Sequence, residues 1–348
     1  MIDTALLRRL CEAPGVSGQE DAVRDLIRRE AEPFAARLAV TPLGSLIVEK
    51  QGLQRARMRL MLIAPMDEPG LLVKSITKEG FLTFHPVGNL PARLLCGRPA
   101  RIFTEKGELP AVIGAKPIHL AKPEERGEVV PIRDLFLDIG ASSQEEAAEW
   151  VEPGDAAVPD GFFLEQGGLV RGRALAGRAA CALLLALIRN DLSHDVTFVF
   201  SAQSETGLSG ASTAAYTVKP ETAIAVCGAE AADAPPTEEA RRNCRIGGGP
   251  VLRFQDHEML YDRTLYRLAR ETAQTAALPF QVTQEQNGVT DAAAVAVSRG
   301  GVRTAAVGFA CRYPAGPLPL ASLADLELTE RLLRGLIERI TGGFSENI

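Results

Sequence analysis

The spacing of hydrophobic residues divides the chain into three stretches, and the first combines two helices with three strands. Leucine, valine and isoleucine recur at helical intervals on either side of a turn at 14–18, and apolar runs with the length of strands follow. The pattern predicts helices over 3–12 and 19–35 and strands over 38–40, 46–48 and 58–64. Because Ser17 precedes Glu20 as in a capping box, we expect Ser17 to cap the second helix.

The second stretch, residues 71–163, consists of short alternating segments separated by Gly and Pro. It predicts one short helix over 144–150 and strands over 71–76, 81–86, 100–103, 111–113, 135–139 and 156–158. Closely spaced short strands favour a small β-barrel-like domain over βαβ units.

In the third stretch, from residue 175 onward, helical and strand-like segments alternate again. It predicts helices over 179–189, 207–216, 259–276, 291–299 and 323–340 and strands over 195–201, 222–226, 251–254, 280–284 and 303–309. Such alternation indicates a sheet that carries helices on both faces. We therefore predict an α/β domain formed by 1–70 and 164–348, into which a β-rich domain at 71–163 is inserted.

Composition argues against two classes of partner. The 348 residues carry a net charge of -6, whereas a nucleic-acid protein needs an excess of Lys and Arg, so no nucleic acid is expected. No run reaches the ~18–20 uninterrupted apolar residues of a membrane span, so no membrane is expected either. Six cysteines are scattered without a Cys-x-x-Cys pair, which fits a reducing cytoplasm.

An acidic loop directly after a predicted buried strand is the first candidate for chemistry. The strand at 58–64 runs into Pro65, Asp67 and Glu68. The two acids fit a metal-free acid/base pair, which requires that burial or a neighbour raise one pKa. Alternatively, Asp67 caps a loop or pairs with Arg178 or Arg312, because an unpaired buried charge is costly.

Several further segments follow one another in an order that resembles a known family. They are APGVSGQE at 13–20, GSLIV at 44–48, KPIHL at 116–120, DIGA at 138–141, QSETGLSGA at 203–211, GVTDA at 288–292 and CRYP at 311–314. Together they resemble the cytoplasmic aminopeptidases that form tetrahedral (TET) dodecamers, the glutamyl and deblocking family of di-zinc exopeptidases. The resemblance implies an α/β, zinc-exopeptidase-like mixed sheet sandwiched by helices, and self-association through the inserted domain into dimers or higher oligomers.

The resemblance also implies which residues stand at the family's catalytic positions. Peptide hydrolysis in that family needs two zinc ions bridged by an aspartate, and a carboxylate as general base. Pro65 stands at the first histidine ligand, Ala176 at the bridging aspartate and Ala315 at the closing histidine, and none of these side chains binds a metal. Ser204 stands at the general base, whereas Asp67 keeps the position that orients a ligating histidine.

Two candidate metal ligands remain in this comparison. Glu205 keeps a ligand position, and Cys227 stands where the family has a ligating aspartate, which a thiolate can replace on zinc. Catalytic zinc normally holds three protein ligands, so we expect no cofactor beyond zinc at a weak single site. Cys227 also fits a small core residue. Ser204 as a serine nucleophile lacks the Gly-x-Ser-x-Gly elbow.

These residues leave two functions open. The favoured one is a degenerate, non-catalytic homologue of a di-zinc aminopeptidase, retained to bind peptides or another ligand, or to assemble with itself or with an active paralogue. The other is a working hydrolase with a one-metal site at Glu205 and Cys227, or a metal-free site. The first is favoured because the ligands and the base are replaced together while the scaffold motifs stay legible. The candidates for the cleft are Asp67, Glu68, Arg178, Glu205, Cys227 and Arg312.

Overall fold

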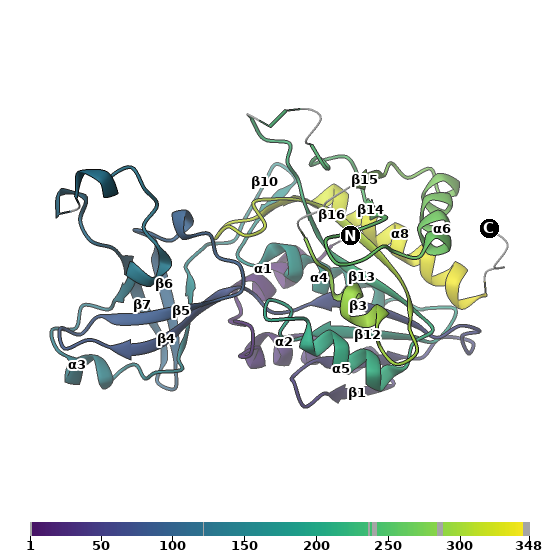
Figure 1. Ribbon diagram of the computed structural model, residues 1–348. Coiled ribbons are helices and arrows are strands. Elements are labelled where there is room, and N and C mark those ends of the chain that lie inside the picture. The colour runs from purple at the N-terminus through teal and green to yellow at the C-terminus, as the bar shows by residue number, and fades with distance from the viewer. Residues whose placement is uncertain (1, 121, 236, 239–241, 284–287, 344–348) are drawn as a thin grey trace. The chain divides into compact units, whose positions relative to one another are not determined.

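The computed structural model describes residues 2–343 apart from 121, 236, 239–241 and 284–287 (Figure 1). The chain separates into two compact units. The first comprises Met1–Asp67, Phe163–Pro314 and Leu318–Ile348, and the second comprises Glu68–Phe162 and Ala315–Pro317.

The first unit is built on a mixed sheet that contains eleven strands among the described residues. They are β1 (Arg37–Val40), β2 (Leu46–Lys50), β3 (Leu60–Pro65), β10 (Leu164–Gln166), β11 (Leu169–Arg171), β12 (Val196–Ser201), β13 (Thr222–Glu230), β14 (Val251–Arg253), β15 (Gln281–Thr283), β16 (Arg303–Arg312) and β17 (Leu320–Ser322). The order is β1-β2-β12-β3-β13-β16-β17-β11-β10, and β14 and β15 pair beside β16. Because β12, β3, β13 and β16 are parallel, their carboxyl ends meet at one edge.

Helices cover both faces of this sheet. One core is shared with α1 (Thr4–Glu12), α2 (Asp21–Ala31), α4 (Leu175–Arg189), α6 (Arg263–Thr275) and α8 (Leu323–Thr341), and the opposite core with α5 (Ser209–Val218) and α7 (Asp291–Ala296). In β3, Leu60 and Leu62 belong to the first core while Met61 and Ile63 belong to the second. Successive side chains of a strand point to opposite faces, which is why a doubly covered strand is a continuous apolar run.

The second unit is a closed barrel of six antiparallel strands. They are β4 (Gly70–Ile76), β5 (Leu82–Val87), β6 (Pro99–Thr104), β7 (Gly107–Gly114), β8 (Phe136–Asp138) and β9 (Ala156–Pro159), closed in the order β4-β5-β8-β7-β6-β9. The helix α3 (Gln144–Ala148) connects β8 to β9. Inward side chains such as Leu71, Ile102 and Ile113 form a core of its own, and closure leaves no unpaired strand edge.

The predicted fold class, a mixed sheet sandwiched by helices with an additional β-barrel, is confirmed. The predicted helix cap is wrong. The N-cap of α2 is Glu20, and its side chain turns away from the helix to accept the N–H groups of Gly18 and Gln203. The helix expected from 259 begins only at Arg263, after the N-cap Asp262. Within the described part of the chain, no helix is long and apolar enough to cross a membrane.

Candidate functional site

The carboxyl ends of three parallel strands bring several predicted site residues together. Pro65 ends β3 and lies beside Ser201, which ends β12. Cys227 in β13 and Pro65 in β3 occupy equivalent positions, because each lies two residues beyond the last pair that joins the two parallel strands. Ligands of open α/β sheets bind at this edge, so the fold supports a site here.

The residues 203–206, between β12 and α5, hold the predicted Ser204 and Glu205. The carboxylate of Asp67 accepts the Glu205 N–H at 2.9 Å, a contact of the kind expected if Asp67 caps a loop. Ser204 Oγ donates to Asp291 Oδ1 at 3.1 Å. Glu205 itself is exposed. The loop thus contains the exposed residue Glu205, while buried acids accept one of its backbone N–H groups and one of its hydroxyl groups.

Asp291, at the start of α7, is the acid that sequence reasoning did not place in the site. It is buried, and it accepts the hydroxyl of Ser201 at 2.5 Å as well as that of Ser204. Burial raises the pKa of Asp291 to about 6, with a contribution from the charge of Asp67, and the two hydroxyls only partly oppose the rise. The motif at 288–292 was a signal for this residue, but the motif did not reveal its partners.

Asp67 is almost fully buried, at 5% exposed. Burial raises its pKa, and the Glu205 N–H and the hydroxyls of Ser17 and Ser204 lower it without cancelling that effect. A second buried acid, Glu20, has its pKa raised mainly by burial and in smaller part by Asp67. Three carboxylates with raised pKa values therefore gather around one loop.

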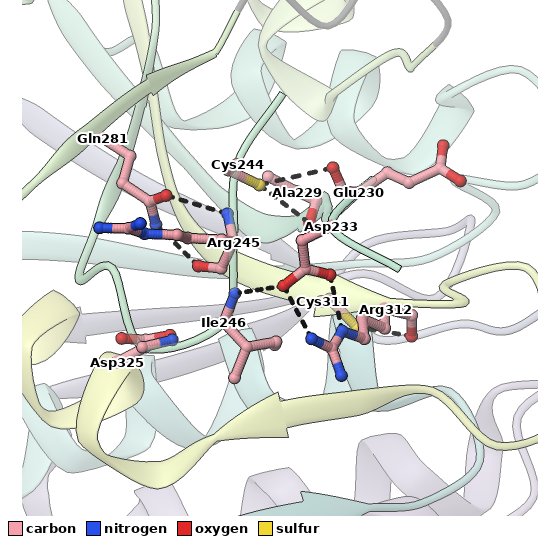
Figure 2. A network of polar contacts seen from close by, with 11 residues as sticks. Ala229, Glu230, Asp233, Cys244, Arg245, Ile246, Gln281, Cys311, Arg312 and Asp325 are labelled. Carbon is pink, nitrogen blue, oxygen red and sulfur yellow. Dashed lines mark hydrogen bonds and ion pairs between the residues drawn. The ribbon is translucent and has the colours of Figure 1, made fainter. Parts of the chain in front are cut away.

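Of the two arginines that sequence reasoning proposed as partners of Asp67, Arg312 pairs with a different acid. The alternative of an Asp67–Arg312 pair is wrong, because Arg312 binds Asp233 through Nε at 2.6 Å and Nη2 at 2.9 Å. Figure 2 shows that Asp233 also accepts the Ile246 N–H. Arg178 is fully buried, and its Nη2 donates to the carbonyl of Ala13 at 3.4 Å.

Close contacts surround two of the positions that the family resemblance assigns to metal ligands. A Cβ atom on Gly177 would lie 2.7 Å from the carbonyl oxygen of Pro65, and one on Gly228 would lie 2.9 Å from the Cβ of Ala176. Pro65 and Ala176 carry no side-chain atom that binds a metal. Among the described residues, no group of three or more His, Cys, Asp and Glu is arranged to hold a metal ion. The donor set at these positions therefore does not fit two zinc ions bridged by a carboxylate.

Two predicted residues, Glu68 and Ala315, belong to the second unit. Glu68 is buried and Ala315 is half-buried. A cavity of about 600 Å³ lies at the opposite end of the main sheet, where Lys50, Leu60 and Asp195 line it. It contains none of the predicted site residues, so the candidate site rests on the geometry of the carboxyl edge and not on this cavity.

Comparison with known structures defines the class of this fold. The TET aminopeptidase of a marine sediment archaeon of the Thaumarchaeota superposes with a TM-score of 0.93 at 33% identity, over 97% of this chain and 96% of that one. The fold is that of a TET-type aminopeptidase. The chain belongs to the M42 glutamyl aminopeptidase family, whose model matches residues 44–332.

Two further relatives cover almost the full length. The lysyl aminopeptidase of Pyrococcus furiosus is 30% identical over 98% of both chains. The TET1 peptidase of Pyrococcus horikoshii, which can assemble into a tetrahedron or a large octahedral shell, is 36% identical with a TM-score of 0.85 over 96% of this chain and 98% of that one. The resemblance inferred from the motifs is thus confirmed at the level of the family.

Proposed function

We propose that this chain is a non-catalytic member of the M42 family, retained to bind peptide-like ligands at the carboxyl edge of the sheet or to serve in assembly. One observation carries the proposal. At Pro65, Ala176 and Ala315 the side chains offer no metal-binding atom, and Ser204 stands in place of the general base. Hydrolysis through a metal-activated water needs both the ligands and the base.

The arrangement around Ser204 supports this reading. A general base must take a proton from the attacking water, and the hydroxyl of Ser204, which donates its own hydrogen to Asp291, is too weakly basic for that role. Asp291 in turn also accepts from Ser201 and is buried. The acids of this site thus serve as acceptors for neighbouring groups of the protein. The retained, exposed carboxylate of Glu205 is the group best placed to meet a ligand.

The assembly part of the proposal rests on the relatives. The Pyrococcus horikoshii TET1 peptidase forms closed shells, and we propose that this chain also associates with itself, or with an active paralogue. We propose a cytoplasmic location, because the six cysteines are scattered along the sequence without a Cys-x-x-Cys pair, which fits a reducing compartment. Light scattering on the purified chain, alone and mixed with a catalytic homologue from the same cell, measures the association.

Metal content and turnover test the loss of catalysis. Protein purified without chelator is measured by metal mass spectrometry and assayed with aminoacyl-nitroanilides in added zinc or cobalt. The expected result is substoichiometric metal and no turnover. Stoichiometric metal together with turnover that Glu205→Ala abolishes would establish the alternative, a one-metal hydrolase that uses Glu205 and Cys227.

A further inference from the structure

Four consecutive residues of the loop between β12 and α5 are held by three segments of the chain that lie far apart in the sequence. The contacts are Gln203 N–H to Glu20 at 2.8 Å, Ser204 Oγ to Asp291 at 3.1 Å, Glu205 N–H to Asp67 at 2.9 Å, and Thr206 Oγ1 with Ser17 Oγ at 3.1 Å. Two of the four contacts come from the segment before α2. This segment therefore belongs to the support of the site, although it is remote from it in sequence.

Glu20 is central to that support. Its Oε1 accepts the Gly18 N–H at 2.7 Å and the Gln203 N–H, and the side chain is buried at 3% exposed. One oxygen thus joins the turn before α2 to the first residue of the loop. Burying a carboxylate is costly, and hydrogen bonds to backbone N–H groups offset that cost.

The backbone of the loop needs such a restraint. Gln203 has a φ of 55°, in the left-handed region that is unfavourable for a residue with a Cβ atom. Strained conformations of this kind persist where the surrounding contacts determine them. The Gln203 N–H is the donor that Glu20 accepts, so the restraint acts directly at the strained residue.

We propose that Glu20 is a positioning residue of the site, which holds Gln203 in its left-handed conformation and thereby sets where the loop presents the Glu205 carboxylate. The proposal rests on the proposed function only in so far as a ligand meets Glu205. The holding of the loop is a property of the protein without any ligand. Glu20 acts through the loop and does not itself touch the ligand.

Amide hydrogen exchange measures this role without a ligand. In Glu20→Ala, the amides of Gln203 and Glu205 are expected to exchange on the order of tenfold faster, which corresponds to loss of one buried hydrogen bond. Glu20→Gln keeps the length and the acceptor oxygen, so it is expected to restore slow exchange. Glu20→Asp keeps the charge, but its shorter side chain does not reach the Gln203 N–H, so its exchange is expected to match that of Glu20→Ala. This variant takes the place of Glu20→Ala if Glu20→Ala does not fold.

Asp325 provides the matched control. It is a buried carboxylate that accepts two loop N–H groups, from Gly247 at 2.7 Å and Gly249 at 2.8 Å, in a different part of the same unit. Asp325→Ala is expected to speed exchange at Gly247 and Gly249 and to leave Gln203 and Glu205 unchanged. Unchanged exchange at Gln203 in both Glu20→Ala and Glu20→Asp, or equal acceleration there by Asp325→Ala, would overturn the proposal.

A binding measurement separates this proposal from the proposed function. A mixture of unmodified tripeptides is titrated against the wild-type protein by calorimetry. Where binding occurs, Glu20→Ala is expected to raise Kd on the order of tenfold while Glu20→Gln stays close to wild type. If the wild type binds no peptide, the peptide-binding part of the proposed function fails, whereas the exchange result still decides the role of Glu20.

Discussion

Two acids near the carboxyl edge of the main sheet, the half-buried Asp233 and the buried Asp291, differ in how their charge is compensated. Asp233, after β13, is held by the guanidinium of Arg312 and by the Ile246 N–H. Asp291, at the start of α7, accepts hydrogen bonds from the hydroxyl groups of Ser201 and Ser204. The two environments therefore shift the pKa in opposite directions.

Burial alone would raise the pKa of Asp233, but the hydrogen bonds from Arg312 and Ile246 and the charge of Arg312 outweigh it and hold this pKa below its ordinary value. At Asp291 burial prevails, and the pKa rises to about 6. Asp233 and Arg312 thus form an ion pair that stabilises the fold. The carboxyl group of Asp291 instead has a raised pKa, and groups with such shifted pKa values are typical of functional sites.

The largest expected effect comes from removing the cation of the Asp233–Arg312 ion pair. Arg312→Ala leaves Asp233, whose side chain is 9% exposed, without its charged partner. Because the side chain of Arg312 is 33% exposed, we expect a loss of about 2 to 3 kcal/mol in the free energy of unfolding, below the range for fully buried pairs. Urea denaturation measures it. Arg37→Ala, which breaks an exposed pair with Glu49, is the control and should cost about 1 kcal/mol or less.

The double variant Arg312→Ala with Asp233→Ala sharpens this test. It removes the unpaired carboxylate as well, so it should cost less than Arg312→Ala alone. If the double variant is the less stable of the two, the loss arises from packing around Arg312, and the contrast drawn between the two acids fails.

The second prediction concerns the uncompensated acid and its dependence on pH. Because the pKa of Asp291 rises from 3.8 to about 6 on folding, its protonated form favours the folded state. Its contribution to stability is fully present below pH 4 and is lost as pH rises through about 6. The loss should be about 2 to 3 kcal/mol, at roughly 1.4 kcal/mol per pKa unit.

Asp291→Asn should remove this component. Urea unfolding between pH 4 and 8 is expected to show a shallower decline in stability for Asp291→Asn than for the wild type. A decline remains, because the pKa values of Asp67 and Glu20 are raised in the same direction. Identical slopes for the two proteins would show that Asp291 does not titrate in this range.

Much of the fold was readable from the chain, because burial on both faces gives β3 its unbroken apolar run and the short alternating segments mark the barrel strands. The short strands β10, β11 and β17 were missed. Local pattern also misled at Ser17, because the side chain of Glu20 is engaged by Gln203, 183 positions away.

The candidate site was predictable only in part. The positions of Asp67, Ser204 and Glu205 on one edge follow from strand ends that the motifs mark. The role of Asp291 depends on its contact with Ser201 and Ser204, which lie about 90 residues earlier. Such a contact arises from the order of the strands in the sheet, and one sequence does not specify that order.

The third prediction concerns a variant that adds a carboxylate to a site that already holds three carboxylates with raised pKa values. Ser204→Glu places a second carboxylate against Asp291, in place of the hydroxyl that Asp291 now accepts. We expect a destabilisation of about 2 kcal/mol at pH 8, smaller at pH 5 where a proton can be shared, and no aminopeptidase turnover in added zinc. Ser204→Ala, which loses one hydrogen bond, should cost about 1 kcal/mol. Turnover by Ser204→Glu would show that the other positions still support catalysis.

The smallest expected effect comes from Asp325, a buried acid whose charge is compensated by backbone N–H groups instead of by a cation. Burial raises its pKa, as at Asp291, but the N–H groups of Gly247 and Gly249 each bind one of its two oxygens. Asp325→Asn keeps one acceptor oxygen and removes a buried charge, so loss and gain partly cancel. We expect a cost of about 1 kcal/mol in urea denaturation at pH 7. A cost as large as that of Arg312→Ala would mean that backbone N–H groups stabilise a carboxylate as effectively as a guanidinium does. The number of hydrogen-bond donors, and not the charge of the partner, would then distinguish a compensated acid from an uncompensated one.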